Sequence, residues 1–261
     1  NNRIKELLSN TLLFALANMG SKILVFLMIP LYTAVLSTEE YGISDMVHTT
    51  AQMLFPILTG MIADAVLRFC FIEGIDKEKV FSTGLKITIW GSILSIFVTI
   101  GLYFIPMFDS IGLYILFVPI MFFNQGLINL MHKFARGINK VKVSATAGLL
   151  SSFFVVTFNL LFLLVFKIGI IGFLLSYTLA DLIAIAYMAK LCQVRKYWTA
   201  RIDHKLKKEM MVFSMPLVPN QISWWAQSSI SRYIMLAWLG VSAVGIYSAT
   251  LRIPSILTVL C

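Results

Sequence analysis

The stretch VGIYSATLRIPSILTVLC, residues 244–261, is a long apolar run with one charged residue, Arg252, in its interior. An apolar run of about 20 residues is long enough to cross the hydrocarbon core of a bilayer as a helix. An ionisable side chain inside such a run usually faces protein or water rather than lipid. The stretch therefore predicts a membrane helix with one polar face. Because the run continues to Cys261 without a polar exit, we expect the sequence to be part of a longer protein.

The rest of the chain has the same apolar character. Of the 261 residues, 59% are hydrophobic and 13% are charged, which is outside the range of soluble domains. The apolar runs predict eight membrane spans, at residues 11–35, 42–71, 81–105, 110–131, 143–166, 169–193, 210–239 and 243–261. No segment alternates polar and apolar residues as the strands of a membrane β-barrel do. The predicted fold is an all-α polytopic transmembrane helical bundle.

The net charge of +9 is distributed unevenly between the gaps that separate the spans. One set of alternate gaps is basic and holds Arg3, Lys5, Lys77, Lys79, Lys133, Arg136, Lys140, Lys142, Arg195, Lys196, Arg201, Lys205, Lys207 and Lys208. The other set holds Glu39, Glu40, Asp109 and a single lysine, Lys167. This asymmetry predicts a cytoplasmic N-terminus. It also favours membrane lipids, rather than nucleic acid, as the partner of the basic 195–208 loop.

The chain offers little material for catalysis or for metal binding. Its three cysteines and three histidines are scattered, and no spacing predicts a metal site, a disulfide framework or a cofactor. A membrane-embedded glycosyltransferase or polymerase, which would be an enzyme, remains the alternative from a different class. It needs paired acids or a nucleotide-binding loop, and the sequence has only dispersed single acids.

Two segments of the chain are similar to each other at an offset of 203 residues. YGISDMVHTTAQML (41–54) aligns with VGIYSATLRIPSIL (244–257), so that Gly42 matches Gly245. Six predicted spans precede the second copy, and an even number of crossings gives both copies the same orientation, as in parallel-repeat transporters. We therefore expect a two-lobe transporter, with a six-helix lobe at 1–200 and the first two helices of a second lobe at 201–261. The full protein would have twelve or more helices, and about eight are present.

Polar residues at helical spacing mark one face in each copy of the repeat. These candidate substrate-path residues are Asn18, Lys22, Asp45, Thr49, Gln52, Gln221, Trp225, Ser228, Arg232, Ser248, Arg252 and Ser255. The 203-residue offset places the polar faces of the two hairpins on each other, so we expect them to line a central cavity. With Lys22, Arg232 and Arg252 against one acid, Asp45, this cavity would be cationic and would favour an anionic substrate.

Other polar residues within the spans have competing interpretations. Asp64 and Arg68, four residues apart, predict a structural ion pair, with ion coupling as the alternative. Asp181 is either an ion-coupling carboxylate or part of an interhelical hydrogen bond, and Trp224 and Trp225 serve either packing or sugar stacking. Amides predicted to link helices are Asn124, Gln125 and Asn129. Prolines predicted to kink or break their helices are Pro30, Pro56, Pro216, Pro219 and Pro254.

Two stretches resemble a known family. LMIPLYTAVLSTEEYGISDMV (27–47), followed by Arg68–Phe69, and SMPLVPNQISWWAQSSISRYIMLAWLGVSAVGIYSATLRIPSIL (214–257) resemble bacterial polysaccharide flippases of the O-antigen type. These belong to the multidrug, oligosaccharidyl-lipid and polysaccharide exporter superfamily. The resemblance implies flipping of undecaprenyl-pyrophosphate-linked oligosaccharide units, by alternating access, from the inner to the outer leaflet of the cytoplasmic (inner) membrane.

The same resemblance implies roles and partners. Lys22, Arg232 and Arg252 would contact the pyrophosphate or acidic sugars, and the product would enter O-antigen, lipopolysaccharide or capsule biosynthesis. A polysaccharide polymerase and a chain-length regulator would be partners. Two alternatives within the superfamily remain open: a flippase for lipid-linked peptidoglycan precursors, whose headgroup is also anionic, and a multidrug or cation exporter, which would need more acidic groups in the cavity.

Overall fold

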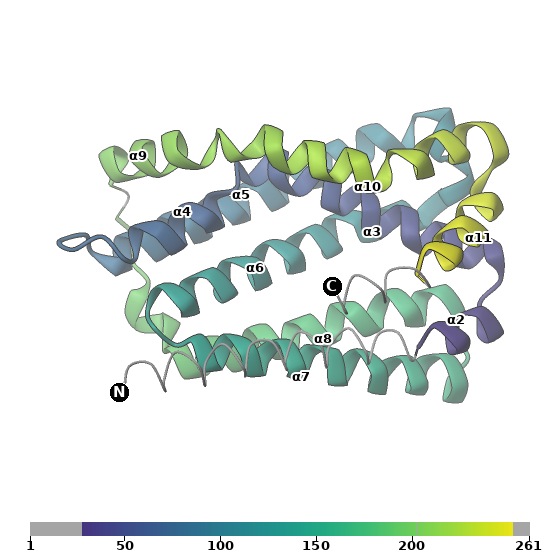
Figure 1. Ribbon diagram of the computed structural model, residues 1–261, viewed down its shortest axis with the longest axis horizontal. Coiled ribbons are helices and arrows are strands. Elements are labelled where there is room, and N and C mark those ends of the chain that lie inside the picture. Colours follow the sequence, from purple (N-terminus) through teal and green to yellow (C-terminus); the bar gives the residue numbers. More distant parts are fainter. Residues whose placement is uncertain (1–27, 202, 253–261) are drawn as a thin grey trace.

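The computed structural model describes residues 28–201 and 203–252, which form a bundle of helices running along one common direction (Figure 1). The elements are α2 (Ile29–Val35), α3 (Thr38–Thr59), α4 (Ile62–Phe69), α5 (Lys77–Tyr103), η1 (Pro106–Leu116), α6 (Phe117–Gly137), α7 (Val141–Asn159), η2 (Leu160–Val165), α8 (Gly169–Cys192), η3 (Val194–Tyr197), α9 (His204–Ser214), α10 (Leu217–Leu239) and α11 (Val241–Arg252). The described part of the chain contains no strand. The predicted all-α fold is confirmed.

Within the described residues, four helical segments are long and apolar enough to cross a membrane. They are α5, η1 with α6, α7 with η2, and α8; the bent pair α3–α4 makes a fifth. Large apolar side chains such as Trp90 and Phe97 on α5 and Phe153 on α7 are exposed, as expected for surfaces that face lipid. α10 has 23 residues, but its serines and amides keep it outside this group. The described part of the last predicted span, α11, is a shorter apolar helix.

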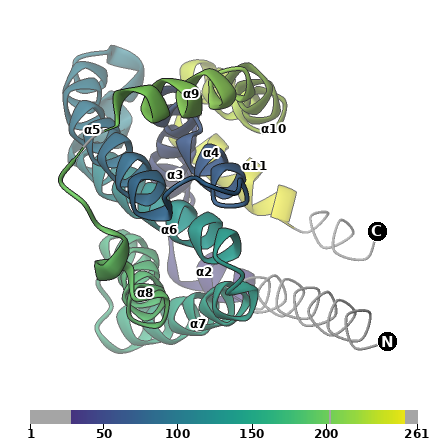
Figure 2. The same ribbon diagram turned by 90° about the vertical axis from the view of Figure 1, so that its left-hand side faces the viewer.

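The helices are arranged around α3 and α6. Seen along the bundle, α7 and α8 lie on one side, α9 and α10 lie on the other, and α3, α4 and α6 lie between them (Figure 2). The buried side chains form two clusters along the bundle. One is built around Tyr32, Met46 and Phe122 near the α2–α11 end, and the other around Phe134 and Met210 at the opposite end.

The two ends of the bundle differ in charge. The α4–α5, α6–α7 and α8–α9 connections lie together at one end (Figure 1). Most of the basic residues in the sequence lie in these connections or in the helix ends beside them. The α2–α3 and α10–α11 connections lie at the other end, with Glu39 and Glu40. The fold therefore gathers the two predicted sets of gaps at opposite ends, called here the basic end and the acidic end.

The predicted span at 42–71 is not one continuous helix. α3 and α4 meet at an angle of 56°, and the break lies at Gly60 and Met61, both in the left-handed conformation with φ of 57° and 54°. Pro56, which was predicted to kink this span, lies inside α3. The helix continues past this proline and is capped at Gly60, whose N–H donates a hydrogen bond to the Pro56 carbonyl. The bend follows from this left-handed pair, four residues beyond the proline.

Candidate functional site

α3 and α11 begin at positions related by the 203-residue offset, Thr38 and Val241. At the start of α3, the Ser37 hydroxyl accepts a hydrogen bond from the Glu40 N–H, and the Glu40 carboxylate accepts one from the Ser37 N–H. This capping box fixes where α3 begins. Both helices start at the acidic end and run in the same direction (Figure 1). The structure therefore agrees with the predicted repeat in the position and direction of these two helices.

The two equivalent helices contact each other through equivalent glycines. A Cβ on Gly42 would lie 2.1 Å from the Val241 carbonyl oxygen, and one on Gly245 would lie 1.9 Å from the Thr38 carbonyl oxygen. The contact is reciprocal, because Gly42 meets Val241 and Gly245 meets Thr38, and these two partner residues are themselves 203 residues apart. Self-complementary contacts of this kind are produced by a twofold relation. Only glycine permits this approach of the two backbones.

A charged network lies three residues beyond the glycines. Arg232 Nε of α10 is 2.6 Å from Asp45 Oδ2 of α3, and Ser248 Oγ of α11 donates to the same oxygen at 2.8 Å. Arg232 Nε also donates to Ser248 Oγ at 3.2 Å, and its Nη1 donates to the Ser228 carbonyl at 2.6 Å. Asp45 and Ser248 are again 203 residues apart. The network joins three helices, two of which are repeat-equivalent.

A cavity of about 310 Å³ opens beside this network. Its lining residues are Asp45, His48, Thr49, Gln52, Ser228, Ser229, Arg232, Ser248 and Leu251. Six of these belong to the predicted substrate path: Asp45, Thr49, Gln52, Ser228, Arg232 and Ser248. The structure thus brings together side chains that are about 200 residues apart in the sequence.

The remaining predicted path residues have other positions. Gln221 is exposed on α10 and is not part of the lining, and Trp225 lies beside the cavity. Its indole Nε1 donates to the Thr49 carbonyl at 3.1 Å, and its ring meets Tyr233 at 5.4 Å, which favours the packing interpretation over sugar stacking. Asn18, Lys22 and Ser255 lie outside the described residues, as does the side chain of Arg252.

The charges of the cavity balance in its described part. One arginine, Arg232, is bound to one aspartate, Asp45, and their side chains are 16% and 12% exposed. The predicted excess of positive charge therefore depends on Lys22 and Arg252. Arg232 still has hydrogen-bonding capacity, because its Nη2 makes no hydrogen bond to any described residue.

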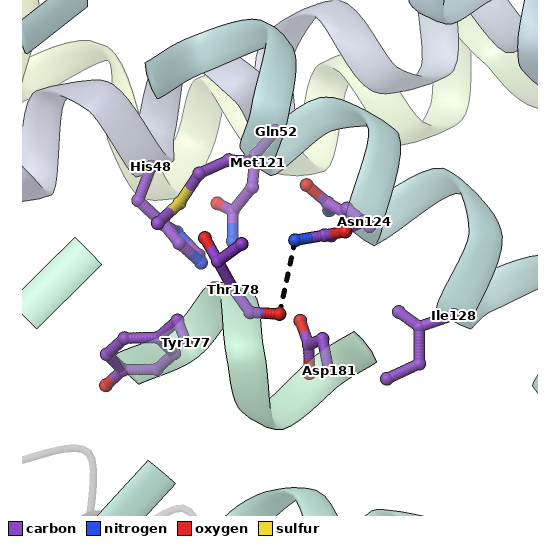
Figure 3. A pocket seen from close by; sticks show the side chains of 9 residues that line it. His48, Gln52, Met121, Asn124, Ile128, Tyr177, Thr178 and Asp181 are labelled. Carbon is purple, nitrogen blue, oxygen red and sulfur yellow. Dashed lines mark hydrogen bonds between the residues drawn. The ribbon is translucent and has the colours of Figure 1, made fainter. Parts of the chain in front are cut away.

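A second cavity, of about 150 Å³, lies between α3, α6 and α8 (Figure 3). It is lined by His48, Gln52, Met121, Asn124, Gln125, Ile128, Tyr177, Thr178 and Asp181. Two amides predicted to link helices, Asn124 and Gln125, lie here, and Asn124 Nδ2 does link α6 to α8 by donating to the Thr178 carbonyl at 3.4 Å. Asp181 accepts an interhelical hydrogen bond from Ser151 Oγ of α7 at 2.9 Å.

Comparison with known protein families decides the assignment. Residues 7–261 match one family, described as polysaccharide biosynthesis protein. The chain belongs to this family. A search of curated proteins finds no match.

Solved structures similar to this family member are transporters. An inward-facing multidrug resistance MATE family transporter of the MOP superfamily is 15% identical, with a TM-score of 0.57 over 90% of this chain and 61% of its own. A MATE protein in complex with Br-NRF is 16% identical, with a TM-score of 0.60 over 98% and 64%. A MOP superfamily transporter from Pyrococcus furiosus is 14% identical, with a TM-score of 0.54 over 93% and 62%. The chain spans less than two thirds of these structures and shares their fold, that of multi-pass membrane proteins.

The predicted ion pair between Asp64 and Arg68 is wrong. Asp64 on α4 instead pairs with Lys133 on α6. The Arg68 guanidinium lies 4.2 Å from the centre of the Phe213 ring on α9, in a cation–π contact. Both side chains therefore reach neighbouring helices rather than each other, because tertiary contacts outweigh a pairing along one short helix, which stabilises by only about 0.2–0.5 kcal/mol.

Sequence reasoning missed two polar lining residues of the larger cavity, His48 and Ser229, and the apolar Leu251. His48 is three residues after Asp45 and four before Gln52, so helical spacing places it on the polar face of α3. The signal that identifies it is this spacing, whereas its isolation in the sequence predicts neither a metal site nor a catalytic pair. Ser229 follows Ser228 directly, and adjacent residues point to different sides of a helix, so the spacing that selects Ser228 leaves Ser229 out.

Proposed function

We propose that this protein flips lipid-linked anionic oligosaccharide units from the inner to the outer leaflet of the cytoplasmic membrane, with undecaprenyl pyrophosphate as the carrier. The family supports a role in polysaccharide biosynthesis, and the fold shared with MOP-superfamily transporters supports translocation rather than catalysis. In this proposal the basic end and the N-terminus face the cytoplasm, in keeping with the distribution of Lys and Arg. The α3–α11 contact then lies at the outer end.

The observation that carries the proposal is the position of Arg232 in the cavity between the two hairpins. Its guanidinium lines the cavity and keeps Nη2 without a hydrogen bond to any described residue. A guanidinium binds phosphate oxygens through parallel, charge-assisted hydrogen bonds. At an effective dielectric constant near 20, such a contact at about 4 Å contributes roughly 4 kcal/mol. This is enough to offset part of the desolvation of a diphosphate.

Phosphate binding at Arg232 would also affect the conformation of the protein, because Arg232 is bound to Asp45. A diphosphate that binds Arg232 competes with the Asp45 carboxylate for the same cation, and the two interactions have similar strengths. Exchange of Asp45 for phosphate would weaken the α3–α10–α11 network at the outer end. Substrate binding would thus favour opening toward the outside, as alternating access requires.

The lipid tail would remain in the bilayer while the headgroup crosses through the cavity. The inside-negative membrane potential favours outward movement of an anion by about 2.3 kcal/mol per charge for each 100 mV. At the outer face, the repeat unit would pass to a polysaccharide polymerase and a chain-length regulator of O-antigen, lipopolysaccharide or capsule synthesis. Export of an organic cation through this cavity is less favoured, because Asp45, the acid that lines it, is bound to Arg232.

The proposal is tested by complementing a strain that lacks the gene with the full-length Arg232→Gln variant. We expect a normal membrane level on an immunoblot and at least a tenfold loss of surface polysaccharide in cell-surface staining. Lys207→Gln, which removes an exposed cation of α9, is the matched control and should complement fully. Normal surface polysaccharide with Arg232→Gln would refute the proposed role. Lys22→Ala and Arg252→Ala extend the test to the two cations outside the described side chains.

A further inference from the structure

The second cavity adjoins the first through two shared side chains of α3. His48 and Gln52 line both the 310 Å³ cavity at Arg232 and the 150 Å³ cavity at Asp181, so the two cavities are adjacent along α3. A headgroup held at Arg232 would therefore have the second cavity beside it. The proposed function assigns a role to the first cavity only.

The polar groups of the second cavity have unused hydrogen-bonding capacity. The side-chain amides of Gln52 and Gln125 make no hydrogen bond to any residue within 28–201 or 203–252. Asn124 is 3% exposed and uses its Nδ2 for the Thr178 carbonyl, while its Oδ1 has no partner among the same residues. In Figure 3, the side chains of Gln52, Asn124 and Asp181 point toward the same space. Amides both donate and accept, which matches the hydroxyl group.

Asp181 determines which ligands this cavity accepts. Its carboxylate receives one hydrogen bond, from Ser151 Oγ, and no described Lys or Arg lies within ion-pair distance of it. A phosphate would be repelled here, in contrast to the cavity at Arg232. A hydroxyl group that donates to the carboxylate would form a charge-assisted hydrogen bond.

The size and the remaining lining fit one small ring. A volume of about 150 Å³ is well above the roughly 10–15 Å³ that a single water molecule needs, so the cavity has room for a small ligand. The Tyr177 ring, Met121 and Ile128 supply apolar surface beside the amides and the carboxylate. A sugar ring combines apolar C–H faces with hydroxyl groups at its edge, so it can satisfy both parts of this lining.

We propose that the cavity at Asp181 binds a neutral, hydroxyl-rich sugar ring of the substrate while Arg232 binds the diphosphate. Gln52, Asn124 and Gln125 exchange hydrogen bonds with the hydroxyl groups, and Asp181 accepts from one of them. This inference rests on the proposed function and adds a saccharide subsite to it. The same site would select among repeat units by the sugar nearest the diphosphate.

The test measures binding of three soluble probes to the full-length protein in nanodiscs: farnesyl diphosphate, and the same lipid carrying one hexose or one N-acetylhexosamine. The wild type should prefer at least one of the sugar-bearing probes. Asp181→Asn and Gln125→Leu should each lower the affinity for that probe by about tenfold and leave the affinity for farnesyl diphosphate unchanged. Arg232→Gln should lower the affinity for all three probes. Thr157→Val, an exposed position on α7, is the control and should change nothing.

The outcomes separate the two proposals. If the wild type binds farnesyl diphosphate but shows no preference for sugar, or if Asp181→Asn weakens all probes equally, the saccharide subsite is refuted and the proposed function stands. If Asp181→Asn keeps the sugar preference and instead abolishes a dependence of binding on sodium or pH, the cavity is a cation site and the subsite is likewise refuted. If the wild type binds no probe, both proposals fail.

Discussion

The two cavities that share His48 and Gln52 of α3 hold their acids in different ways. In the larger cavity, Asp45 is bound by Arg232 and Ser248 from two other helices, so the acid contributes to packing between the hairpins. In the smaller cavity, Asp181 has one hydroxyl partner and no described cation. In the proposed function, the first arrangement exchanges its acid for an anion. In the proposed saccharide subsite, the second disfavours anions and leaves polar groups available for a neutral ligand.

The largest expected effect comes from breaking the contact that places the two hairpins together. Gly245→Ala puts a Cβ 1.9 Å from the Thr38 carbonyl oxygen, and backbone atoms cannot move aside without separating α3 from α11. We expect a loss of about 1–3 kcal/mol or more, measured as a melting temperature lower by several degrees.

Gly101→Ala is the matched control, because a Cβ there meets nothing within 4 Å. Alanine favours helix over glycine by up to about 1 kcal/mol, so this variant should be neutral or slightly stabilised. Equal melting temperatures for the two variants would contradict the close backbone approach at Gly245.

The next largest effect is expected on the Asp45–Arg232 pair, whose contribution to stability can be measured apart from its proposed role in anion binding. Asp45→Asn and Arg232→Gln each leave a largely buried charge without its partner, which costs up to about 3 kcal/mol at this partial exposure. The double variant should be more stable than the sum of the two losses predicts, since no lone charge remains. Thermal denaturation of the four proteins gives the coupling, and strict additivity would show that the pair is not formed.

The sequence predicted the lining of the larger cavity much better than that of the smaller one. The 203-residue offset and helical spacing placed Asp45, Thr49, Gln52, Ser228 and Ser248 on facing surfaces, because a repeat and a helical period are both properties of sequence order. The smaller cavity was not predicted. Its residues come from α3, α6 and α8, and neither α6 nor α8 has a partner at the 203-residue offset within the sequence. Only tertiary packing brings Gln125 beside Asp181.

The same distinction explains the errors at the basic end of the bundle. Asp64 and Arg68 satisfy the spacing rule for a pair on one helix, yet Lys133 and Phe213 on neighbouring helices take their place. The bend at Gly60 depends on a left-handed pair of residues, whereas the sequence drew attention to the nearby proline. Local rules thus located the elements, and contacts between elements decided the partners.

A smaller effect is expected from the hydrogen bond that joins Trp225 of α10 to the backbone of α3 beside the larger cavity. Trp225→Phe removes the indole donor to the Thr49 carbonyl and keeps an aromatic ring against Tyr233. Stability should fall by about 1 kcal/mol in thermal denaturation. Farnesyl diphosphate affinity should stay unchanged, and a tenfold loss would mean that Trp225 contacts the substrate.

The smallest effect is expected at the basic end, outside both cavities. Hydrogen bonding from the Leu206 N–H, together with Lys79, lowers the pKa of Asp203 below its usual value. This carboxylate therefore stabilises the fold above its unfolded-state pKa of about 3.9, and the contribution is lost as the pH falls through the lower folded-state pKa.

Asp203→Asn should accordingly melt slightly below the wild type at pH 7, with the difference vanishing at strongly acidic pH. Probe binding should be unaffected at neutral pH. A difference in melting temperature that grows on acidification would reverse the assigned direction of the pKa shift.

The proposed function depends on Arg232 as the anion contact and on Asp45 as its competitor. The most direct measurement is the affinity of wild-type, Asp45→Asn and Arg232→Gln proteins for farnesyl diphosphate in nanodiscs, all at neutral pH and one salt concentration. The account predicts tighter binding than wild type with Asp45→Asn and at least tenfold weaker binding with Arg232→Gln. Unchanged affinity with Arg232→Gln, or an equal loss with both variants, would contradict it.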